Sequence, residues 1–113
     1  MRKLSLDAVG REQLASARAA PAARSATTVF GGHEHALRQT VIALLKDASL
    51  AEHDNPGEAT LYVLSGRVEL AAGPDRWQAR RGDLLIVPDV RHTLDALEDS
   101  VVVLTAVPRA HIR

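Results

Sequence analysis

The chain has 113 residues, of which 46% are hydrophobic, and its 14 basic and 14 acidic side chains leave no formal net charge. This length predicts one domain, and the missing basic excess argues against nucleic acid as the main partner. Because there is no cysteine, disulfides and thiolate metal sites are excluded. No apolar run approaches the roughly 18 residues of a membrane span, and the N-terminus lacks a signal-peptide pattern. We therefore expect a cytoplasmic protein with no membrane partner.

The N-terminal residues 5–20 have apolar side chains at roughly helical spacing. These side chains are Leu6, Val9, Leu14, Ala17 and Ala20. Ser5 or Asp7 is suited to cap the start of a helix, and Pro21 would end it. Gly10 lowers the helix propensity in the middle. The segment is therefore expected to form either a weak helix that needs a surface to pack on or a frayed terminal arm.

From Thr27 onward the pattern is typical of short β-strands separated by turns. The expected strands are Thr27–Phe30, Leu37–Leu45, Ser49–His53, Thr60–Leu64, Arg67–Ala71, Arg76–Ala79, Leu84–Val87, His92–Leu97 and Val101–Val107. Many short strands with frequent turns predict an all-β sandwich or closed barrel. The predicted organisation is a helix or arm over 1–26, a barrel over 27–108 and a C-terminal tail over 109–113.

Two segments carry a pattern beyond the strands themselves. Asp47 to Gly66 reads DASLAEHDNPGEATLYVLSG, and Gly82 to Leu97 reads GDLLIVPDVRHTLDAL. In this order, they resemble the paired motifs of the cupin superfamily, G-x5-H-x-H-x3,4-E-x6-G and G-x5-P-x-G-x2-H-x3-N. The resemblance implies a cupin-type double-stranded β-helix, or jelly-roll barrel, with one pocket lined by both motifs.

Local physical chemistry agrees with this resemblance. Gly66 stands where two strands meet in a tight bend, which requires a positive φ or a close backbone approach. In the preceding strand, Leu61 and Val63 share one face and Tyr62 the other. Both faces of that strand are mostly apolar, which predicts a barrel interior on one side and a second layer on the other. The apolar run GDLLIVP is expected to lead from its turn directly into the core.

The resemblance also implies which residues would hold a metal, because metal-binding cupins typically supply three histidines and one glutamate. His53 matches the first histidine, but Asn55 occupies the position of the second. Ala59 occupies the glutamate position, and the nearest acid, Glu58, is one place away. His92 matches the last histidine only after a one-residue deletion. Two of the four ligands therefore survive in recognisable positions.

Two imidazoles are too few for a tight first-row metal site. A one-residue offset in a strand would turn Glu58 to the opposite face, whereas a loop after Pro56 would free it from that rule. In the second case His53, His92 and Glu58 form a set of two histidines and a carboxylate, and Asn55 adds a carbonyl oxygen. A weakly bound divalent transition metal is the cofactor that this set allows. In the first case the histidines are polar residues of a metal-free pocket.

Four further residues are candidates for the pocket. Strand alternation would put His33 and His35 on one face, where one of them could replace a lost ligand, although a solvated loop edge is the simpler explanation. Arg38 inside the barrel would pair with an anion, and outside it would be an ordinary surface residue. Tyr62 and Trp77 suit a core or a subunit interface better than a stacking platform.

The predicted function is the binding of a small polar molecule in the barrel pocket by a stand-alone cupin without an assigned activity. One alternative is a metal-dependent enzyme of the oxygenase or isomerase type that uses His53, His92 and Glu58. Another is a ligand-sensing regulator that acts through a partner. Whether the chain is an enzyme stays open, because the fold does not decide it. A barrel this small leaves apolar surface exposed, so we also expect a homodimer.

Overall fold

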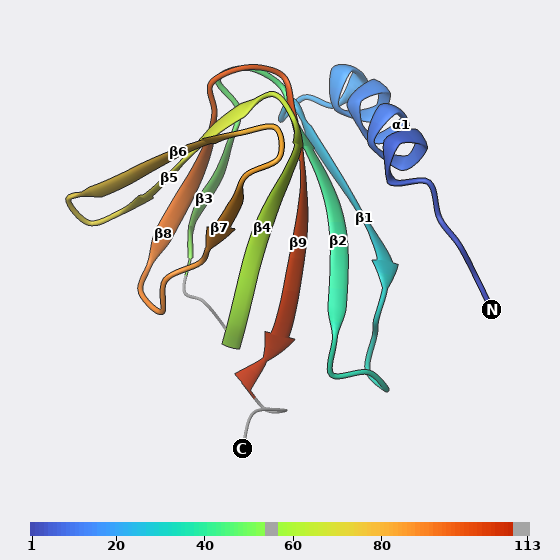
Figure 1. Cartoon of the computed structure of the whole chain (residues 1–113). Helices are drawn as coiled ribbons and strands as arrows, with labels where there is room; N and C mark the ends of the chain where they lie inside the picture. The colour runs from blue at the N-terminus through green and yellow to red at the C-terminus, as the bar shows by residue number, and fades with distance from the viewer. Residues whose placement is uncertain (54–56, 110–113) are drawn as a thin grey trace.

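The computed structural model describes residues 1–53 and 57–109, with the side chains of residues 51–53 excepted. The described chain forms one helix followed by nine strands (Figure 1). These elements are α1 (Leu6–Ala19), β1 (Arg24–Phe30), β2 (Arg38–Leu44), β3 (Ser49–His53), β4 (Gly57–Ser65), β5 (Arg67–Ala72), β6 (Asp75–Arg80), β7 (Leu84–Ile86), β8 (His92–Ala96) and β9 (Ser100–Pro108). No described helix combines the length and the apolar character needed to cross a bilayer.

The strands form two antiparallel sheets that face each other. The first sheet has the order β1-β2-β9-β4-β7, and the second has the order β3-β8-β5-β6. Neighbours such as β2 and β9 are far apart in sequence, as expected when the chain crosses repeatedly between two layers. This arrangement confirms the predicted all-β jelly roll. The first strand begins at Arg24, three residues before the expected start, because Arg24 already pairs with Leu44.

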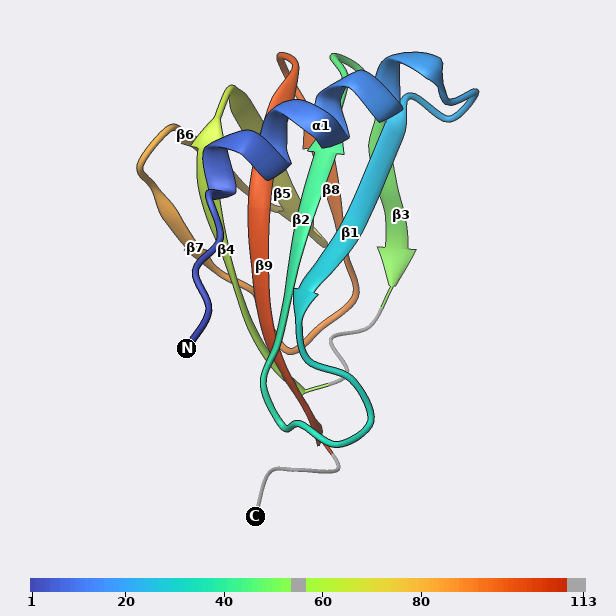
Figure 2. The same cartoon turned by 90° about the vertical axis from the view of Figure 1, so that its right-hand side faces the viewer.

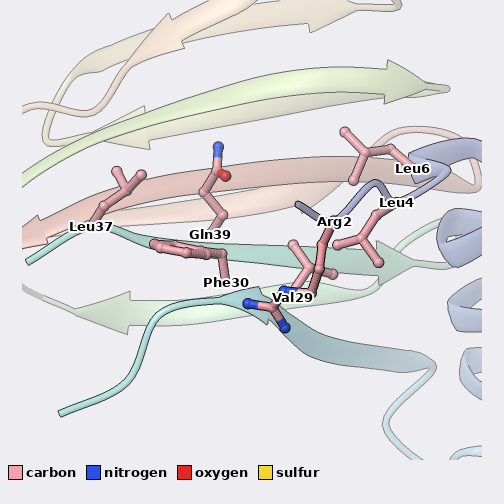
Figure 3. A pocket seen from close by; sticks show the side chains of 7 residues that line it. All are labelled: Arg2, Leu4, Leu6, Val29, Phe30, Leu37 and Gln39. Carbon is pink, nitrogen blue, oxygen red and sulfur yellow. The ribbon is translucent and has the colours of Figure 1, made fainter. Parts of the chain in front are cut away.

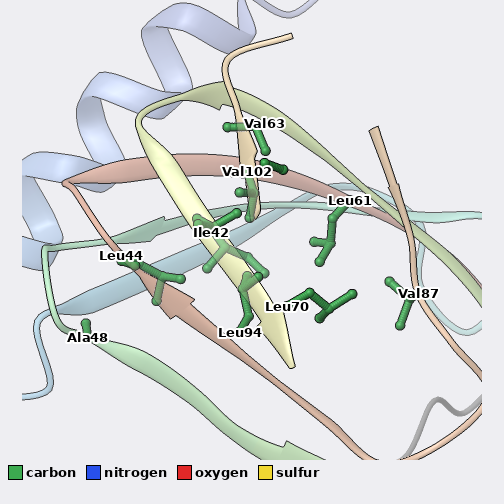
Figure 4. Packing of buried hydrophobic residues seen from close by; sticks show 12 residues of the cluster. Ile42, Leu44, Ala48, Leu61, Val63, Leu70, Val87, Leu94 and Val102 are labelled. Carbon is green, nitrogen blue, oxygen red and sulfur yellow. The ribbon is translucent and has the colours of Figure 1, made fainter. Parts of the chain in front are cut away.

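The main core lies between the two sheets and follows the two-residue alternation of the strands. Leu44, Val63, Val68 and Leu70 are completely buried there, together with Leu94 at 2% exposure (Figure 4). The expected faces of β4 are confirmed, since Leu61 and Val63 point into this core and Tyr62 is exposed.

The run GDLLIVP does not enter the core as a whole. Leu84 is 56% exposed and Ile86 is 69% exposed, and only Leu85 and Val87 turn inward. The expectation of a fully buried run was wrong because β7 is the edge strand of its sheet. An edge strand has one face on the core and lacks a neighbour on one side, so every second apolar side chain remains in solvent.

The N-terminal segment is a helix and lies diagonally across the outer face of the first sheet (Figure 2). Ser5 is the N-cap, and its hydroxyl accepts the Ala8 N–H at 3.2 Å. A second apolar cluster fills the space between helix and sheet. Its buried members are Ala17, Val41, Ala43, Val101 and Val103. The weak helix therefore finds its surface on its own barrel.

Gly10 has a packing role that its helix propensity does not indicate. It is buried, and a Cβ built on it would lie 3.1 Å from Cγ1 of Val101 in β9. The absence of a side chain lets the helix approach the sheet at this point.

Replacing Gly10 by leucine is expected to lower the free energy of unfolding by about 1–3 kcal/mol, because the new side chain would push α1 away from β9. Ala15→Leu is the matched control, since Ala15 is on the exposed side of the same helix and should change stability by less than about 0.5 kcal/mol. Urea unfolding measures both variants. Equal stability of the two would contradict the close approach.

Candidate functional site

The two histidines that the motifs single out are opposed in one ladder. β3 and β8 pair with His53 opposite His92, after an irregularity that follows the Leu50–Leu94 pair. The end of β3 and the start of β8 lie at the end of the sandwich where the β1–β2 loop and the C-terminal end of β9 also lie (Figure 1). This end is called the mouth below. The two motif segments thus meet at the mouth through their backbones, although they are far apart in sequence.

His92 is the best-defined side chain of this site. It is 5% exposed, and Nδ1 lies 2.8 Å from the carbonyl oxygen of Val90. Because a carbonyl oxygen only accepts, Nδ1 donates in this bond, and in a neutral ring Nε2 then carries the lone pair. His92 shares the inward alternation of β8 with Leu94 and Ala96. A buried imidazole with one nitrogen fixed by the backbone is oriented rather than free to rotate.

Small and polar residues form the mouth end of the first sheet. Arg38 pairs with Ala106, and Ala106 pairs with Ala59, so the three make one cross-strand row. The row shares its alternation with Ile42 in β2 and Leu61 in β4, which belong to the core. Ala59 therefore occupies an inner-face position, and Arg38 stands exposed at the rim of the same face. The other two positions of the row, Ala106 and Ala59, hold only alanine side chains.

Glu58 does not share this face. β4 begins at Gly57, so Glu58 lies inside the strand, pairs with Val107 and is exposed. Alternation places it on the side of β4 opposite to Ala59. The strand begins early because Gly57 fits tightly against β9: a Cβ there would lie 1.9 Å from the Val107 carbonyl oxygen. The one-residue offset between Glu58 and the family's glutamate position at Ala59 therefore falls within a strand, so the two residues lie on opposite faces.

Among the side chains that the structure describes, the donors do not fit a tightly bound transition metal. Across the described residues, no group of three or more His, Asp and Glu side chains is placed to hold an ion. The inner-face position that would carry the family's glutamate holds Ala59, and Glu58 is on the other face. Asn55 lies outside the described residues.

The remaining candidates, His33, His35 and Tyr62, lie outside the β3–β8 ladder that pairs His53 with His92. His33 and His35 are exposed in the β1–β2 loop, where His35 N–H donates to the Gly32 carbonyl, so strand alternation does not apply to them. The ring of His35 lies 4.9 Å from that of Phe30. Tyr62 is on the outer face of β4 and is 40% exposed.

A separate hollow of about 400 Å³ lies on the outer face of the first sheet, between the N-terminal residues and the end of the β1–β2 hairpin (Figure 3). Its lining is mostly apolar, with polar groups from Arg2 and Gln39. Gln39 also donates to the Thr105 hydroxyl at 3.2 Å. The hollow is on the opposite side of the sheet from the inner row of Arg38, Ala106 and Ala59.

Two features of the mouth were not predicted from the sequence, namely the small side chain of Ala106 and the backbone anchor of His92. Ala106 is invisible to motif reasoning because it lies in β9, outside both motifs, and only the register with β2 and β4 brings it to the mouth. The proximity of Val90 to His92 in sequence was a usable signal, since a two-residue separation permits a local side-chain to backbone bond.

The family of cupin domains matches the chain over residues 40–108, which is more than half of its length. The chain belongs to the cupin family. A conserved protein of unknown function from Streptococcus pyogenes is 26% identical, with 75% of this chain and 74% of that chain covered and a TM-score of 0.68. No curated protein matches in sequence.

Two further solved structures support the fold alone. A cupin 2 conserved barrel domain protein from Salinispora arenicola is 17% identical, with a TM-score of 0.69, and the match covers 97% of this cupin and 89% of that chain. KdgF from a Halomonas species is 22% identical, with coverage of 76% and 79% and a TM-score of 0.65. The Salinispora match extends beyond the barrel into the N-terminal region.

Proposed function

We propose that this cupin binds a small polar molecule at the mouth of its barrel without a tightly held transition metal. The observation that carries the proposal is the buried, backbone-anchored imidazole of His92 at an inner-face position, with His53 opposite it in the ladder. Residues opposed in an antiparallel ladder present their side chains on one face. The proposal is that both imidazoles contact the ligand.

The inner row of the first sheet supports the same proposal. Ala59 and Ala106 leave space where a larger side chain would fill the mouth, and Arg38 adds a positive charge at the rim. Small sites are usually apolar cups with a few fixed polar groups that orient the ligand. Here the fixed polar group would be the imidazole of His92, and the guanidinium of Arg38 would attract a polar or anionic group.

The metal-dependent enzyme is the weaker alternative because its carboxylate is misplaced. It requires Glu58 beside His53 and His92, and Glu58 is exposed on the outer side of β4. A regulatory cupin that signals through a partner would use the same mouth, and no described feature favours it over simple binding.

Protein purified without a chelator or a metal-affinity tag is expected to contain far less than one transition metal ion per chain. Zinc and non-haem iron sites use at least three protein ligands, and the sequence keeps two histidines, His53 and His92, in recognisable ligand positions. Elemental analysis of the wild type, His53→Ala and His92→Ala measures the metal content per chain. One tightly held metal per chain that is lost in either variant would contradict the proposal and favour the enzyme alternative.

The same proteins test ligand binding by thermal shift against a panel of small carboxylates, sugars and amino acids. A ligand at 100 times its Kd adds about 2.7 kcal/mol of stability. At least one panel member is expected to stabilise the wild type and to lose that effect in both histidine variants. Stabilisation that survives His92→Ala would place the binding elsewhere.

We also propose that the protein is a homodimer, because exposed apolar side chains remain on the barrel after α1 has covered part of it. They include Tyr62, Trp77, Leu84 and Ile86. Clusters of this kind mark association surfaces more often than isolated residues do.

A further inference from the structure

We infer that the partner of this chain is a second copy that pairs through the free edge of β7, so that two first sheets join into one continuous sheet. The inference rests on the homodimer proposed above and assigns its interface. Among the described residues, β7 is the last strand of its sheet and pairs only with β4. An edge strand presents unpaired backbone groups that another strand can pair with.

The hydrogen-bond alternation identifies which backbone groups are at the edge. Val87 N–H donates to the Ala59 carbonyl, and Val63 N–H donates to the Asp83 carbonyl, each at 3.0 Å. Residues 83 and 87 therefore direct their backbone groups towards β4, and residue 85 does the same. The N–H and C=O groups of Leu84 and Ile86 point the other way, towards the open edge.

This pattern is self-complementary about one point. In an antiparallel pairing of two copies with the two-fold axis at Leu85, Leu84 of each copy lies opposite the partner's Ile86. Both residues of that pair direct their backbone groups across the edge, so each pair exchanges two hydrogen bonds and the strand uses all four outward groups. A two-fold axis at Leu84 or Ile86 would use fewer of these outward N–H and C=O groups. A two-fold contact of this kind closes at the dimer.

The side chains around the edge suit burial. Leu84 and Ile86 are the strongly exposed apolar residues of β7, and they would cover each other across the axis. A groove of about 430 Å³ lies between β6 and β7, with Trp77 on one side and Leu85 on the other. Trp77 is 45% exposed and pairs with the core residue Leu70, so its ring extends the inner face towards the edge. Aromatic anchors beside an open strand are typical of interface centres.

Charges at the two ends of β7 favour the antiparallel direction and a second copy as the occupant. Arg81 precedes the strand and Asp89 follows it, and both are exposed. An antiparallel partner brings Arg81 towards the partner's Asp89 at each end. Asp89 already accepts from Arg109 at 2.8 Å, so its carboxylate would join two guanidinium groups. A parallel pairing would oppose like charges.

Sedimentation of the wild type, Ile86→Lys and Val90→Lys at tens of micromolar tests the interface. The wild type and Val90→Lys should be dimers, because Val90 is exposed but lies outside the edge strand. Ile86→Lys should weaken dimerisation by at least about tenfold. The isoleucine side chain that the dimer would bury is lost, and a lysine on the edge strand opposes strand pairing. Ile86 is 69% exposed in the single chain, so circular dichroism should show an unchanged fold.

Leu85→Cys provides an independent readout in a protein with no cysteine of its own. On the two-fold axis the two Cα atoms of a non-hydrogen-bonded pair lie about 4.5 Å apart, within the range of a disulfide. Mild oxidation should give a covalent dimer on a non-reducing gel, and Val90→Cys should not. A monomeric wild type would overturn the homodimer itself. A wild-type dimer that persists in Ile86→Lys and gives no Leu85→Cys cross-link would overturn only the assigned edge.

Discussion

Replacing Gly66 by alanine is expected to lower the free energy of unfolding by roughly 3 kcal/mol or more. Gly66 has a φ of +82°, which L side chains rarely adopt. A Cβ there would also lie 2.3 Å from the Asp99 carbonyl oxygen and 2.3 Å from Oγ of Ser100. Backbone strain and a steric clash thus act at the same position.

The clash would also disturb a buried polar link. Ser100 is 1% exposed, and its hydroxyl accepts the Arg67 N–H at 3.0 Å and lies 2.7 Å from the Glu98 carbonyl as a donor. This hydroxyl ties the β4–β5 bend to the start of β9. Displacing it would leave a backbone N–H of Arg67 without its acceptor, which costs about 1–3 kcal/mol when the group is buried.

Gly73→Ala separates the two causes. Gly73 also has a positive φ, +56°, but nothing lies within 4 Å of a Cβ built on it. It should therefore show only the strain of the left-handed region, about 1–2 kcal/mol. Urea unfolding of both variants gives the comparison. Equal losses in the two would show that the close approach at Gly66 contributes nothing.

The strands and turns could be predicted because local chemistry specifies them. Gly66 was expected to need a positive φ or a close approach, and the structure has both. Leu61 and Val63 were expected on one face of their strand, and both are buried in the core. These inferences depend only on the residue and its immediate neighbours, which the sequence states directly.

The placement of Glu58 could not be predicted because it depends on where β4 begins. Pro56 and Gly57 are ordinary turn residues, and they favoured a loop around Glu58. The strand nevertheless starts at Gly57, since only glycine fits against the Val107 carbonyl of β9. That contact joins segments about fifty residues apart in the chain, and no local pattern reports it. One residue of uncertainty in a strand start decides whether a carboxylate faces the mouth.

The exposure of β7 and the docking of α1 are likewise long-range results. The run from Leu84 to Val87 has the composition of a central strand, and its edge position follows only from the strand order. The apolar stripe of α1 indicated that the helix packs on a surface. It did not indicate whether that surface belongs to its own barrel or to a partner's. Val101 and Val103 of the same chain provide it.

Leu94 links the packing of the core to the proposed site. It is 2% exposed, two residues along β8 from His92 on the same inner face, and it pairs with Leu50 on one side and Leu70 on the other. Leu70 and Leu44 are completely buried in the same cluster. The interior is therefore filled with side chains from this layer onward, and a ligand would have to occupy the space between Leu94 and the mouth.

Leu94→Ala is accordingly expected to lower the free energy of unfolding by about 2–5 kcal/mol, the range for a buried leucine whose removal leaves a cavity. The loss combines the transfer free energy of the missing atoms with the cavity that a close-packed core fills only partly. Leu84→Ala is the control, since Leu84 is 56% exposed in the single chain and should cost less than about 0.5 kcal/mol in dilute monomer. Urea unfolding at low protein concentration measures both. A loss below about 1 kcal/mol for Leu94→Ala would mean that the layer beneath His92 is loosely packed. The ligand space would then extend deeper into the barrel than the His53–His92 pair.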